Sequence, residues 1–570
     1  MTQHRRGPVV GMLAVVAVAL TACAGLPTTG DVTVGLARED VGLPPDISQI
    51  AAEPLEGASP EQIVEGFLDA ALTPTDGWQI AREFLSPELA ETWRPSAGVT
   101  IDEGAAGREF NAEVVGEVDT AEKGDVRVLL DQIARVDEDG AYTELSGDES
   151  VASFQVARNG NGEWRITAAA DGIVLDAEAF TQVFRKYSLQ FYDQTWTRLV
   201  ADVRWLPRRP QIATTLTQSL LEGAPSDWLA PAVRSAFPSD VSLVRDAVPI
   251  SEDKVATVEL TPSALSLEAT QLARMRTQLE ETLRSAGVSE VRLTVNGSDL
   301  NAGQAAIQSA VPEPGSVVLT DSQFGTYLGD EITPYAGISE GILKLAPSVV
   351  AVDMAVDNQR AAVQLDTGAV WTVADGRVDQ LDARAGLLKP SMDPYGYTWT
   401  VPSSAPQALV AWEPNVTQVD VANAFSEASS ISQLRVGPDG VRVAAVATVG
   451  GQRWIISAAI VRDENQVPVE LGPTQMLAQL DGEALALSWV GDDSLSVLVN
   501  SDNSPAVLRQ DVGGPGASAA APEGAQMLSG GRMATSVRIL NAEGVLFAQR
   551  GTTWQTGRAD VLVLGTHAGQ

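Results

Sequence analysis

The sequence predicts a multidomain protein in which two α+β domains precede an all-β propeller. A chain of 570 residues is too long for a single hydrophobic core. Its hydrophobic content of 44% is enough for folded domains. Apolar residues follow a helical period only before Pro312, and after it short strands recur around turns at an interval typical of propeller blades.

The chain begins with the features of a cleaved export signal. Two arginines precede an apolar stretch from Val9 to Leu20, and small residues follow it. This order predicts a signal peptide over residues 1–22, because the apolar stretch is too short to span a bilayer. The run Leu20-Thr21-Ala22-Cys23 resembles the bacterial lipobox at every position. We therefore expect Cys23 to be the lipidation site and the first residue of the mature protein. An uncleaved anchor helix or an incidental cysteine is the alternative.

Acyl chains such as palmitate on Cys23 would anchor the protein to a membrane. Residues 23–57 are rich in Pro, Gly and Thr and show no sustained apolar period, which predicts an extended, lipidated tether. The formal net charge of −36 disfavours nucleic acid as a partner. The same charge opposes an anionic lipid surface, so the anchor must hold the domains at the membrane.

Cysteine and histidine usage narrows the chemistry. Cys23 is the only cysteine, which excludes disulfides and thiolate metal sites. The two histidines are His4, removed with the signal, and His567, which we expect in a frayed C-terminal tail. Histidine-based catalysis and histidine-ligated metals are therefore disfavoured. We expect no metal, no cofactor and no catalytic residue.

Residues 58–178 are predicted to form the first α+β domain. The run Ser59-Pro60-Glu61-Gln62 is a capping box that starts a helix, and a second helical stretch runs from Ile80 to Leu85. Turns at Asp139-Gly140 and Asn159-Gly160 then separate strand-like runs. These runs are Phe110–Val118, Asp125–Ala134, Ser150–Arg158 and Glu163–Ala168. Helices followed by a meander are an architectural analogy to the nuclear-transport-factor-like superfamily, and the analogy carries no site with it.

Residues 179–311 are predicted to form a second α+β domain. Strands are expected at Tyr187–Tyr192, Thr197–Trp205, Val241–Val248, Val255–Leu260 and Val291–Val295, with helices from Gln211 to Leu221 and around Leu272, Met275, Leu279 and Leu283. The segments Leu220–Pro225, Ala236-Phe237-Pro238 and Val291–Gly297 resemble the sequence pattern of the GerMN module. Ala224 between the glycine and the proline is the one departure from that pattern.

Residues 312–570 are predicted to form a β-propeller, because small sheets that repeat at this interval bury their faces by radial stacking. The turns lie at Asp357-Asn358, Asp393-Pro394-Tyr395-Gly396, Pro438-Asp439-Gly440, Asp492-Asp493 and Glu543-Gly544. A pair of β-sandwiches is the alternative. Six tryptophans occur in these strands, and we expect them in the core rather than in a ligand-stacking ring: Trp371, Trp399, Trp412, Trp454, Trp489 and Trp554.

Three motifs could carry chemistry, and each has a simpler explanation. Gly337-Ile338-Ser339-Glu340-Gly341 matches a nucleophile elbow but enters an all-β region, so we expect an accidental match. Asp439 lies between proline and glycine and is explained by turn geometry. Asp137-Glu138-Asp139-Gly140 lacks the ligand spacing of a calcium loop and predicts a solvated hairpin turn. Carboxylates are abundant, yet no spacing singles out an acid/base pair.

The order of lipobox, tether, α+β domain, GerMN module and propeller is similar to that of the actinobacterial LpqB lipoprotein family, over essentially the whole mature chain. This resemblance implies a protein on the outer side of the cytoplasmic membrane that acts as an accessory of the MtrA-MtrB two-component system and contacts the sensor domain of the kinase MtrB. It implies no catalytic residues, and Cys23 is the one position carried over by motif.

The function expected from the sequence is that of a non-enzymatic, membrane-anchored lipoprotein that binds and modulates an MtrB-like histidine kinase, linked to cell envelope and division homeostasis. Tethering would raise the effective concentration of both partners on one surface. Two other functions stay open: a lipoprotein that binds cell-wall glycan or peptide, and a carboxylate-based envelope hydrolase.

Overall fold

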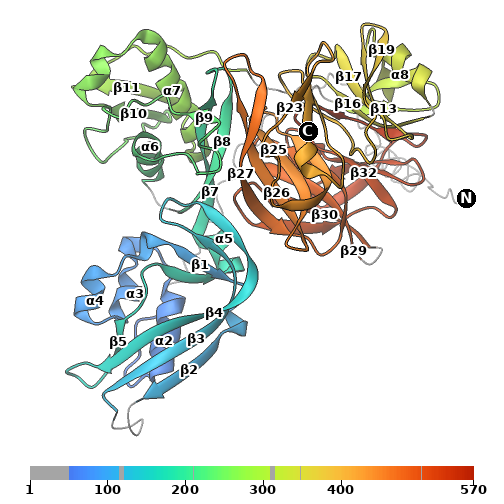
Figure 1. Ribbon diagram of the computed structural model, residues 1–570. Coiled ribbons are helices and arrows are strands. Elements are labelled where there is room, and N and C mark those ends of the chain that lie inside the picture. The colour runs from blue at the N-terminus through green and yellow to red at the C-terminus, as the bar shows by residue number, and fades with distance from the viewer. Residues whose placement is uncertain (1–50, 115–120, 209–210, 309–314, 347, 502–503) are drawn as a thin grey trace, which may run out of the picture. The chain divides into compact units, whose positions relative to one another are not determined.

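The computed structural model of the protein describes residues 51–114, 121–208, 211–308, 315–346, 348–501 and 504–570 (Figure 1). The expected signal peptide, Cys23 and the tether up to Ile50 lie outside the described residues. No helix in the described ranges is long and apolar enough to cross a bilayer.

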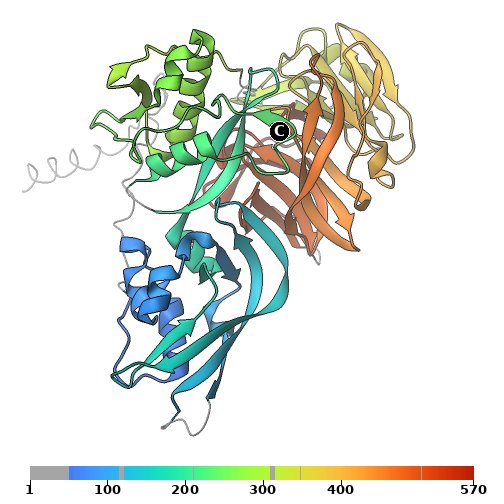
Figure 2. The same cartoon turned by 60° about the vertical axis from the view of Figure 1, so that its left-hand side comes forward.

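The first domain is a six-stranded sheet with helices on one side (Figures 1 and 2). The strands are β1 (Val99–Asp102), β2 (Glu109–Val114), β3 (Lys123–Val136), β4 (Tyr142–Arg158), β5 (Trp164–Ala168) and β6 (Ile173–Asp176). The helices are α2 (Pro60–Ala70), α3 (Gln79–Glu83), α4 (Pro87–Thr92) and α5 (Ala177–Val183). Helix α2 packs its apolar face, including Ile63 and Phe67, against the sheet.

The capping box that starts α2 is confirmed, since the Ser59 side chain accepts from the backbone of Gln62 and the Gln62 side chain accepts from Ser59. The expected strands correspond to β2–β5, with the predicted turns at both positions. Part of the run Phe110–Val118 lies outside the described residues. Strands β1 and β6 and helices α4 and α5 were not predicted from the sequence. The nuclear-transport-factor-like architecture stays a prediction.

The second domain begins with the long hairpin of β7 (Phe184–Asp193) and β8 (Leu199–Pro207), joined at β7 by β9 (Val233–Arg234). Helix α6 (Ile212–Glu222) follows the hairpin. The parallel strands β10 (Val255–Glu259) and β11 (Glu290–Val295) are connected by helix α7 (Ala269–Leu283), and β12 (Ser298–Asp299) pairs with β11. Leu272, Met275, Leu279 and Leu283 are buried in the domain core, as the helical spacing predicts.

The predicted strand over Val241–Val248 is wrong. This segment makes only an isolated bridge, between Leu243 and Leu260. Threonine side chains take two of its backbone donors: the Val248 N–H donates to Thr214 Oγ1 at 2.9 Å, and the Ser242 N–H donates to Thr261 Oγ1 at 3.2 Å. The Val244 N–H donates to the Glu259 carbonyl at 3.0 Å, so a single bridge forms and no ladder follows. Alternating apolar residues therefore pack into the core here without a strand ladder.

The last domain is a six-bladed propeller in the described residues. The blades are β36-β13-β14-β15 (Val563–Leu564, Ser316–Leu319, Phe324–Leu328, Glu331–Thr333), β16–β19 (Val349–Met354, Arg360–Leu365, Val370–Ala374, Arg377–Asp382), β20–β23 (Ser391–Met392, Thr398–Thr400, Val410–Trp412, Gln418–Asp420), β24–β27 (Ala428–Val436, Arg442–Val449, Gln452–Arg462, Pro468–Gln479), β28–β31 (Glu483–Val490, Ser494–Ser501, Ser504–Asp511, Gly516–Ala520) and β32–β35 (Ala525–Ser529, Arg538–Asn541, Leu546–Arg550, Thr553–Thr556). Helix α8 (Ser339–Leu345) leads into the second blade.

The ring of blades is closed. The innermost strands contact one another in the order β16, β20, β24, β28, β32 and β36, and β36 contacts β16 again. A pair of sandwiches has no such cycle, so the propeller prediction is confirmed. Four of the five predicted turns connect an innermost strand to the second strand of its blade, whereas Glu543-Gly544 joins β33 to β34.

The expectation that His567 lies in a frayed tail is wrong. The C-terminal segment supplies β36 to the first blade and β37 (Thr566–His567) beside β16. His567 is only 4% exposed, and the Thr566 hydroxyl donates to the buried carboxylate of Asp353 at 2.7 Å. Burial lowers the pKa of His567 to about 4, so its imidazole is neutral at physiological pH. The tail is ordered because it closes the ring of blades.

Candidate functional site

The hairpin β7–β8 is shared by all three domains. Tyr187, Leu189 and Phe191 alternate along β7 into the core of the second domain. At the other end of the hairpin, Phe184 and Trp205 belong to the core of the first domain. The hairpin also contacts the propeller, so it is an element that touches all three domains.

Three neighbouring blades contact this hairpin, each through the turn after its innermost strand or through the first residue of the next strand. In the blade β20–β23, the Tyr395 hydroxyl donates to Asp193 Oδ2 at 3.1 Å. In the blade β24–β27, Arg442 Nη1 donates to the Ala201 carbonyl at 3.0 Å. In the blade β28–β31, Asp493 Oδ2 lies 3.2 Å from Lys186 Nζ. Turns that were predicted only from their spacing therefore lie at the contact between the propeller and the hairpin β7–β8.

Arg442 is the most buried of these contacts, with 1% of its side chain exposed. Its Nε donates to Asp439 Oδ2 at 2.5 Å, and its guanidinium lies 5.0 Å from the centroid of the Trp489 ring. Asp439 Oδ1 accepts from the backbone N–H groups of Val441 and Arg442, at 2.8 and 3.0 Å. Asp439 is thus a turn residue, as predicted, and it also orients the arginine that reaches the second domain.

Trp205 connects the first domain to the propeller. Its backbone N–H donates to the Gly140 carbonyl at 2.7 Å, and its indole N–H donates to the Gly513 carbonyl at 3.0 Å. Gly140 ends the acidic turn Asp137–Gly140, which joins β3 to β4. The predicted solvated turn is therefore half right: its three carboxylates are exposed, while its glycine is docked on β8.

A cleft of about 400 Å³ opens beside this turn, and residues of all three domains line it. One wall holds a buried ion pair, with Arg204 Nη2 2.9 Å from Asp202 Oδ2. The same carboxylate accepts from the Ser226 backbone at 2.8 Å, directly after the Leu220–Pro225 segment of the GerMN pattern. The ion pair holds this loop against the hairpin. Within the described ranges, no group of three or more His, Cys, Asp or Glu side chains is arranged to hold a metal.

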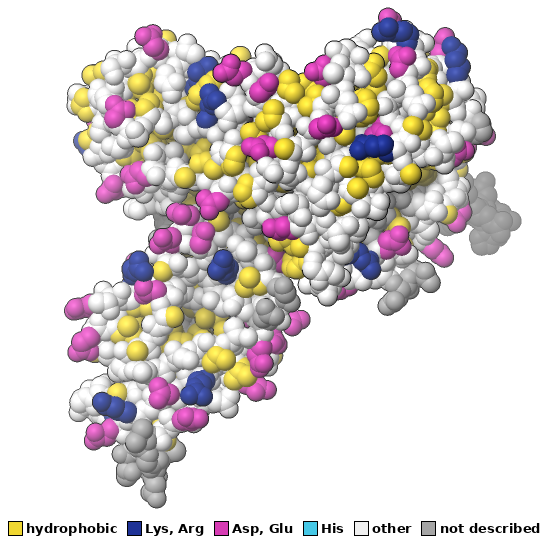
Figure 3. All heavy atoms as spheres, in the orientation of Figure 1, with side chains coloured by type: hydrophobic (Ala, Val, Ile, Leu, Met, Phe, Trp, Pro, Cys, Tyr) yellow, Lys and Arg dark blue, Asp and Glu magenta, His cyan; other side chains and the backbone are white. Residues whose placement is uncertain are grey.

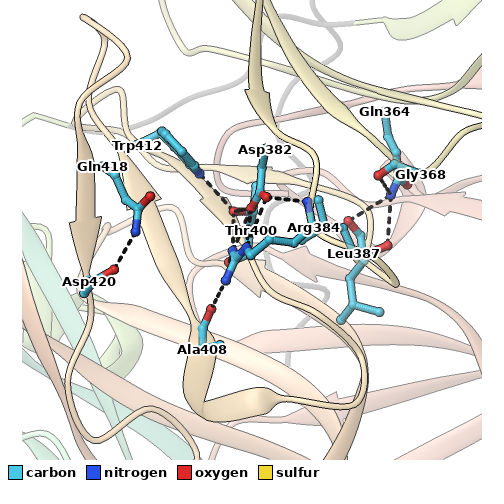
Figure 4. A network of polar contacts seen from close by, with 11 residues as sticks. Gln364, Gly368, Asp382, Arg384, Leu387, Thr400, Ala408, Trp412, Gln418 and Asp420 are labelled. Carbon is cyan, nitrogen blue, oxygen red and sulfur yellow. Dashed lines mark hydrogen bonds and ion pairs between the residues drawn. The ribbon is translucent and has the colours of Figure 1, made fainter.

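Polar networks inside the propeller are structural. Figure 4 shows Asp382 at the end of β19 accepting from Arg384 and from the Thr400 hydroxyl, the latter at 2.7 Å, while the Trp412 indole donates to Thr400 Oγ1 at 3.0 Å. These contacts tie two neighbouring blades together. Trp399, Trp454 and Trp489 are buried in the core as expected, and the other three propeller tryptophans are partly exposed on separate blades.

Ser339 of the G-x-S-x-G match is a helix-start residue. Its hydroxyl donates to the Phe324 carbonyl at 2.8 Å and accepts from the Tyr335 N–H at 2.8 Å. Because the hydroxyl both donates to and accepts from backbone groups, it has a structural role at the start of α8. The sequence interpretation of an accidental match agrees with this geometry.

The residues that join the domains were missed by sequence reasoning. Lys186 and Asp193 have partners more than a hundred residues away, apart from local turn contacts, and no local motif marks them. Tyr395 lies in a predicted turn, but nothing in that turn indicated its partner Asp193. One signal existed: Arg442 stands between Val441 and Val443 in a strand-like apolar run. An arginine placed there is expected to be buried and paired.

Comparisons with known proteins match each part of the chain. A family model described as Lipoprotein LpqB, N-terminal domain, matches residues 53–181; one described as Sporulation and spore germination matches 188–301; and one described as Lipoprotein LpqB beta-propeller domain matches 323–561. These three parts in this order define a class of multidomain lipoprotein that combines a Germane domain with a propeller.

The chain belongs to the LpqB lipoprotein family. It is 28% identical over 532 residues to Lipoprotein LpqB of Streptomyces coelicolor, covering 84% of both chains. It is 24% identical over 538 residues to Lipoprotein LpqB of Bifidobacterium longum, covering 90% of both chains. Among solved structures, the nidogen/laminin complex matches 44% of this chain and 96% of that chain at 7% identity, with a TM-score of 0.31, too low to carry an argument.

Proposed function

We propose that this protein is a lipid-anchored, non-enzymatic binding protein that contacts the extracytoplasmic sensor domain of an MtrB-like histidine kinase and modulates it. The relatives are named lipoproteins, which supports anchoring at a membrane. The extracytoplasmic face and lipidation of Cys23 are part of the proposal, and they are supported by the lipobox pattern. The likeness of the first domain to the nuclear-transport-factor-like superfamily belongs to the same proposal.

The observation that carries the proposal is the shared hairpin β7–β8. Contacts from three blades and from the first domain meet on it, including the buried bond of Arg442 to Ala201 and the bond of Trp205 to Gly140. A body held together in this way presents a preformed surface, and a preformed surface loses little conformational entropy on binding. A weak contact of such a surface is strengthened when an anchor confines both partners to one membrane.

Modulation requires that the protein bind one state of the kinase more tightly than another. A ligand shifts a conformational equilibrium only by its difference in affinity for the two states. Acidic side chains are spread over the visible surface rather than gathered in one patch (Figure 3). The net charge of −36 therefore explains solubility better than it explains the choice of partner.

The test is binding and kinase activity in one membrane. Full-length protein and full-length kinase are placed in the same nanodiscs, and association and autophosphorylation are measured with and without the lipoprotein. An unrelated acidic lipoprotein with a propeller serves as the control. We expect enrichment over that control and a changed autophosphorylation rate. Equal retention of both lipoproteins would contradict the proposal, and retention on isolated peptidoglycan instead would favour the wall-binding alternative.

A further inference from the structure

The turn that joins β7 to β8 carries a tryptophan in an unusual backbone conformation. Trp196 has φ +64°, in the left-handed region that a bulky side chain rarely adopts. Its indole is half-buried rather than enclosed in a core. Backbone strain of this kind is retained most often where it positions a side chain for function.

Two arginines from other elements lie beside this indole. The guanidinium of Arg274, in helix α7, lies 4.4 Å from the centroid of the Trp196 ring, and that of Arg234, in β9, lies 5.2 Å from it. Gln194 orients Arg234, because its Oε1 accepts from Arg234 Nε at 3.0 Å. The amide oxygen is uncharged, so it fixes the guanidinium without neutralising it. The fold thus brings two cations and an indole together from three separate segments.

No carboxylate balances these cations. Neither of the two arginines makes an ion pair within the residues that the structure describes. The carboxylate of the turn, Asp193, is 1% exposed and accepts from the backbone N–H groups of Thr197 and Arg198 at 2.7 and 2.9 Å. In the same described ranges, the Arg274 guanidinium and the Trp196 indole N–H donate no hydrogen bond, and neither group is enclosed. Free donors and positive charge therefore face solvent in a chain of net charge −36.

This chemistry selects an oxyanion beside an apolar phase. Guanidinium groups bind phosphate and carboxylate oxygens through several N–H groups at once, and an indole N–H can only donate. An apolar side chain lies next to the turn: Ile307 is 38% exposed, and the N–H of Gln308 donates to the Thr197 carbonyl at 2.7 Å. Tryptophan, arginine and exposed aliphatic side chains together are typical of surfaces that rest in the headgroup region of a bilayer.

The family relation favours a lipid over an acidic protein as the source of the oxyanion. The relatives are named lipoproteins, so lipid phosphates lie within reach of the anchored chain. Residues 24–50 span at most about 90 Å when fully extended. The acidic remainder of the chain repels an anionic bilayer, but salt screens this repulsion beyond about 8 Å at physiological ionic strength. A local cationic cluster can therefore make close contact.

We propose that the turn between β7 and β8, together with Arg234 and Arg274, docks on anionic phospholipid headgroups of the membrane to which the protein is anchored. The two guanidinium groups bind lipid phosphates, the Trp196 indole N–H donates to a phosphate oxygen, and Ile307 covers the boundary with the acyl chains. Docking holds the second domain against the bilayer and fixes its orientation there. The proposal rests on the anchoring that is part of the proposed function.

The test measures how much this surface adds to a weak anchor. The chain from Cys23 onward keeps every described residue, and it is coupled through its only thiol to a single myristoyl chain. One such chain binds a bilayer only marginally and reversibly, so further contacts change the partition visibly. Partition onto vesicles of equal parts phosphatidylcholine and phosphatidylglycerol is compared with partition onto phosphatidylcholine alone.

Two double variants with the same change in charge are compared. Arg234→Gln with Arg274→Gln removes both cations of the proposed surface. Arg245→Gln with Arg284→Gln is the control in the same domain, at arginines 76% and 69% exposed that each pair with a carboxylate. As a measurement that needs no variant, modification of the parent chain's arginines by a glyoxal reagent is followed by mass spectrometry with and without anionic vesicles.

We expect the double variant of the surface to bind anionic vesicles about tenfold more weakly than the control double variant, and all chains to bind neutral vesicles equally. Anionic vesicles should protect Arg234 and Arg274 from the reagent and leave Arg284 as reactive as before. Equal partition of the two double variants onto anionic vesicles, or unchanged modification of Arg234 and Arg274, overturns the proposal. Displacement from these vesicles by poly-glutamate, added at the same charge concentration as the lipid, also overturns it, because an acidic protein is then the better ligand.

Failure of this proposal and failure of the proposed function give different results. The acyl chain is attached chemically, so the partition does not depend on lipidation of Cys23 in the cell or on the kinase. Equal partition of the double variants ends the docking proposal and leaves kinase binding standing. A chain that docks here but neither takes up acyl label in cells nor binds the kinase ends the proposed function and leaves the lipid-binding surface in place.

Discussion

At the residue scale, Arg442 illustrates how one buried side chain joins two domains. Its guanidinium pairs with Asp439 within the blade and donates to the backbone of β8 outside it. Both side chains of this ion pair are almost fully buried, at 1% and 3% exposed. Removing the arginine leaves a buried carboxylate without its counter-charge, which is far more unfavourable than losing an exposed ion pair.

We therefore expect Arg442→Ala to lower the free energy of unfolding of the propeller by about 3–5 kcal/mol. Urea unfolding followed by tryptophan fluorescence measures it. Arg94→Ala is the control, since Arg94 pairs with Asp171 at the surface with 66% of its side chain exposed. That control should change stability by about 1 kcal/mol or less. Equal effects of the two substitutions would contradict the role given to Arg442.

A second residue-scale prediction concerns Glu144 in β4. Burial raises the pKa of its carboxyl to about 7 from 4.5, and a hydrogen bond from the Tyr142 hydroxyl opposes this only in part. The folded chain therefore holds a proton that the unfolded chain releases between these two pH values. The stability that this group contributes is full below pH 4.5 and is lost as the pH rises through about 7.

Between these two pKa values, the free energy of unfolding of the first domain falls by about 3 kcal/mol as the pH rises. We expect Glu144→Gln to remove this loss, so that the variant is more stable than the parent at pH 8 and similar to it at pH 4.5. Denaturation midpoints across this range measure it. Glu149→Gln, in the exposed part of the same strand, should follow the parent curve. A parent and variant that run parallel throughout would refute the pKa assignment.

At the scale of elements, a turn that looks like surface structure acts as a domain contact. Gly140 has φ +83°, and a Cβ at this position would lie 2.9 Å from the Trp205 carbonyl oxygen. Gly162 has nearly the same backbone, φ +82°, but a Cβ there would meet no atom within 4 Å. Comparing alanine substitutions at these two glycines therefore distinguishes the effect of backbone strain from the effect of losing the interdomain contact.

Alanine at Gly162 should destabilise the first domain by about 1 kcal/mol through backbone strain alone. Alanine at Gly140 should add to that strain a loss of the contact with β8. Hydrogen exchange at the Trp205 amide, which donates to the Gly140 carbonyl, is expected to speed up in Gly140→Ala and to stay unchanged in Gly162→Ala. Matching exchange rates in the two variants would show that the turn does not hold the domains together.

The closing strands β36 and β37 form a second test at this scale. They complete the first blade and pair with β16, so deleting residues 561–570 opens the ring of blades. We expect faster hydrogen exchange in the blades next to the opening and unchanged exchange in the first domain, which serves as the internal control. An unchanged propeller after this deletion would mean that the ring closes without its last strands.

At the scale of the whole molecule, the decisive residue is Cys23, which lies outside the described residues. Lipidation of this thiol would be the link between the folded domains and the membrane. Cys23→Ser is expected to abolish labelling by a palmitate analogue and to release the protein from the membrane fraction. Sedimentation with membranes and label uptake measure it, with the parent chain alongside. A serine variant that still sediments like the parent would place the anchor elsewhere.

The sequence by itself determined the features that depend on local chemistry. The Ser59 capping box, the apolar stripe of α7 and the blade-sized spacing of turns all rest on residues close together in the chain, and each was found where the pattern predicted it. The family assignment follows from the order of such local patterns.

Only the tertiary structure decided what depends on distant partners. Burial of His567 by ring closure, the missing strand at Val241–Val248 and the contact of Arg442 with β8 each involve groups far apart in sequence. Periodicity shows which face of an element is apolar, but it does not show which other element covers that face.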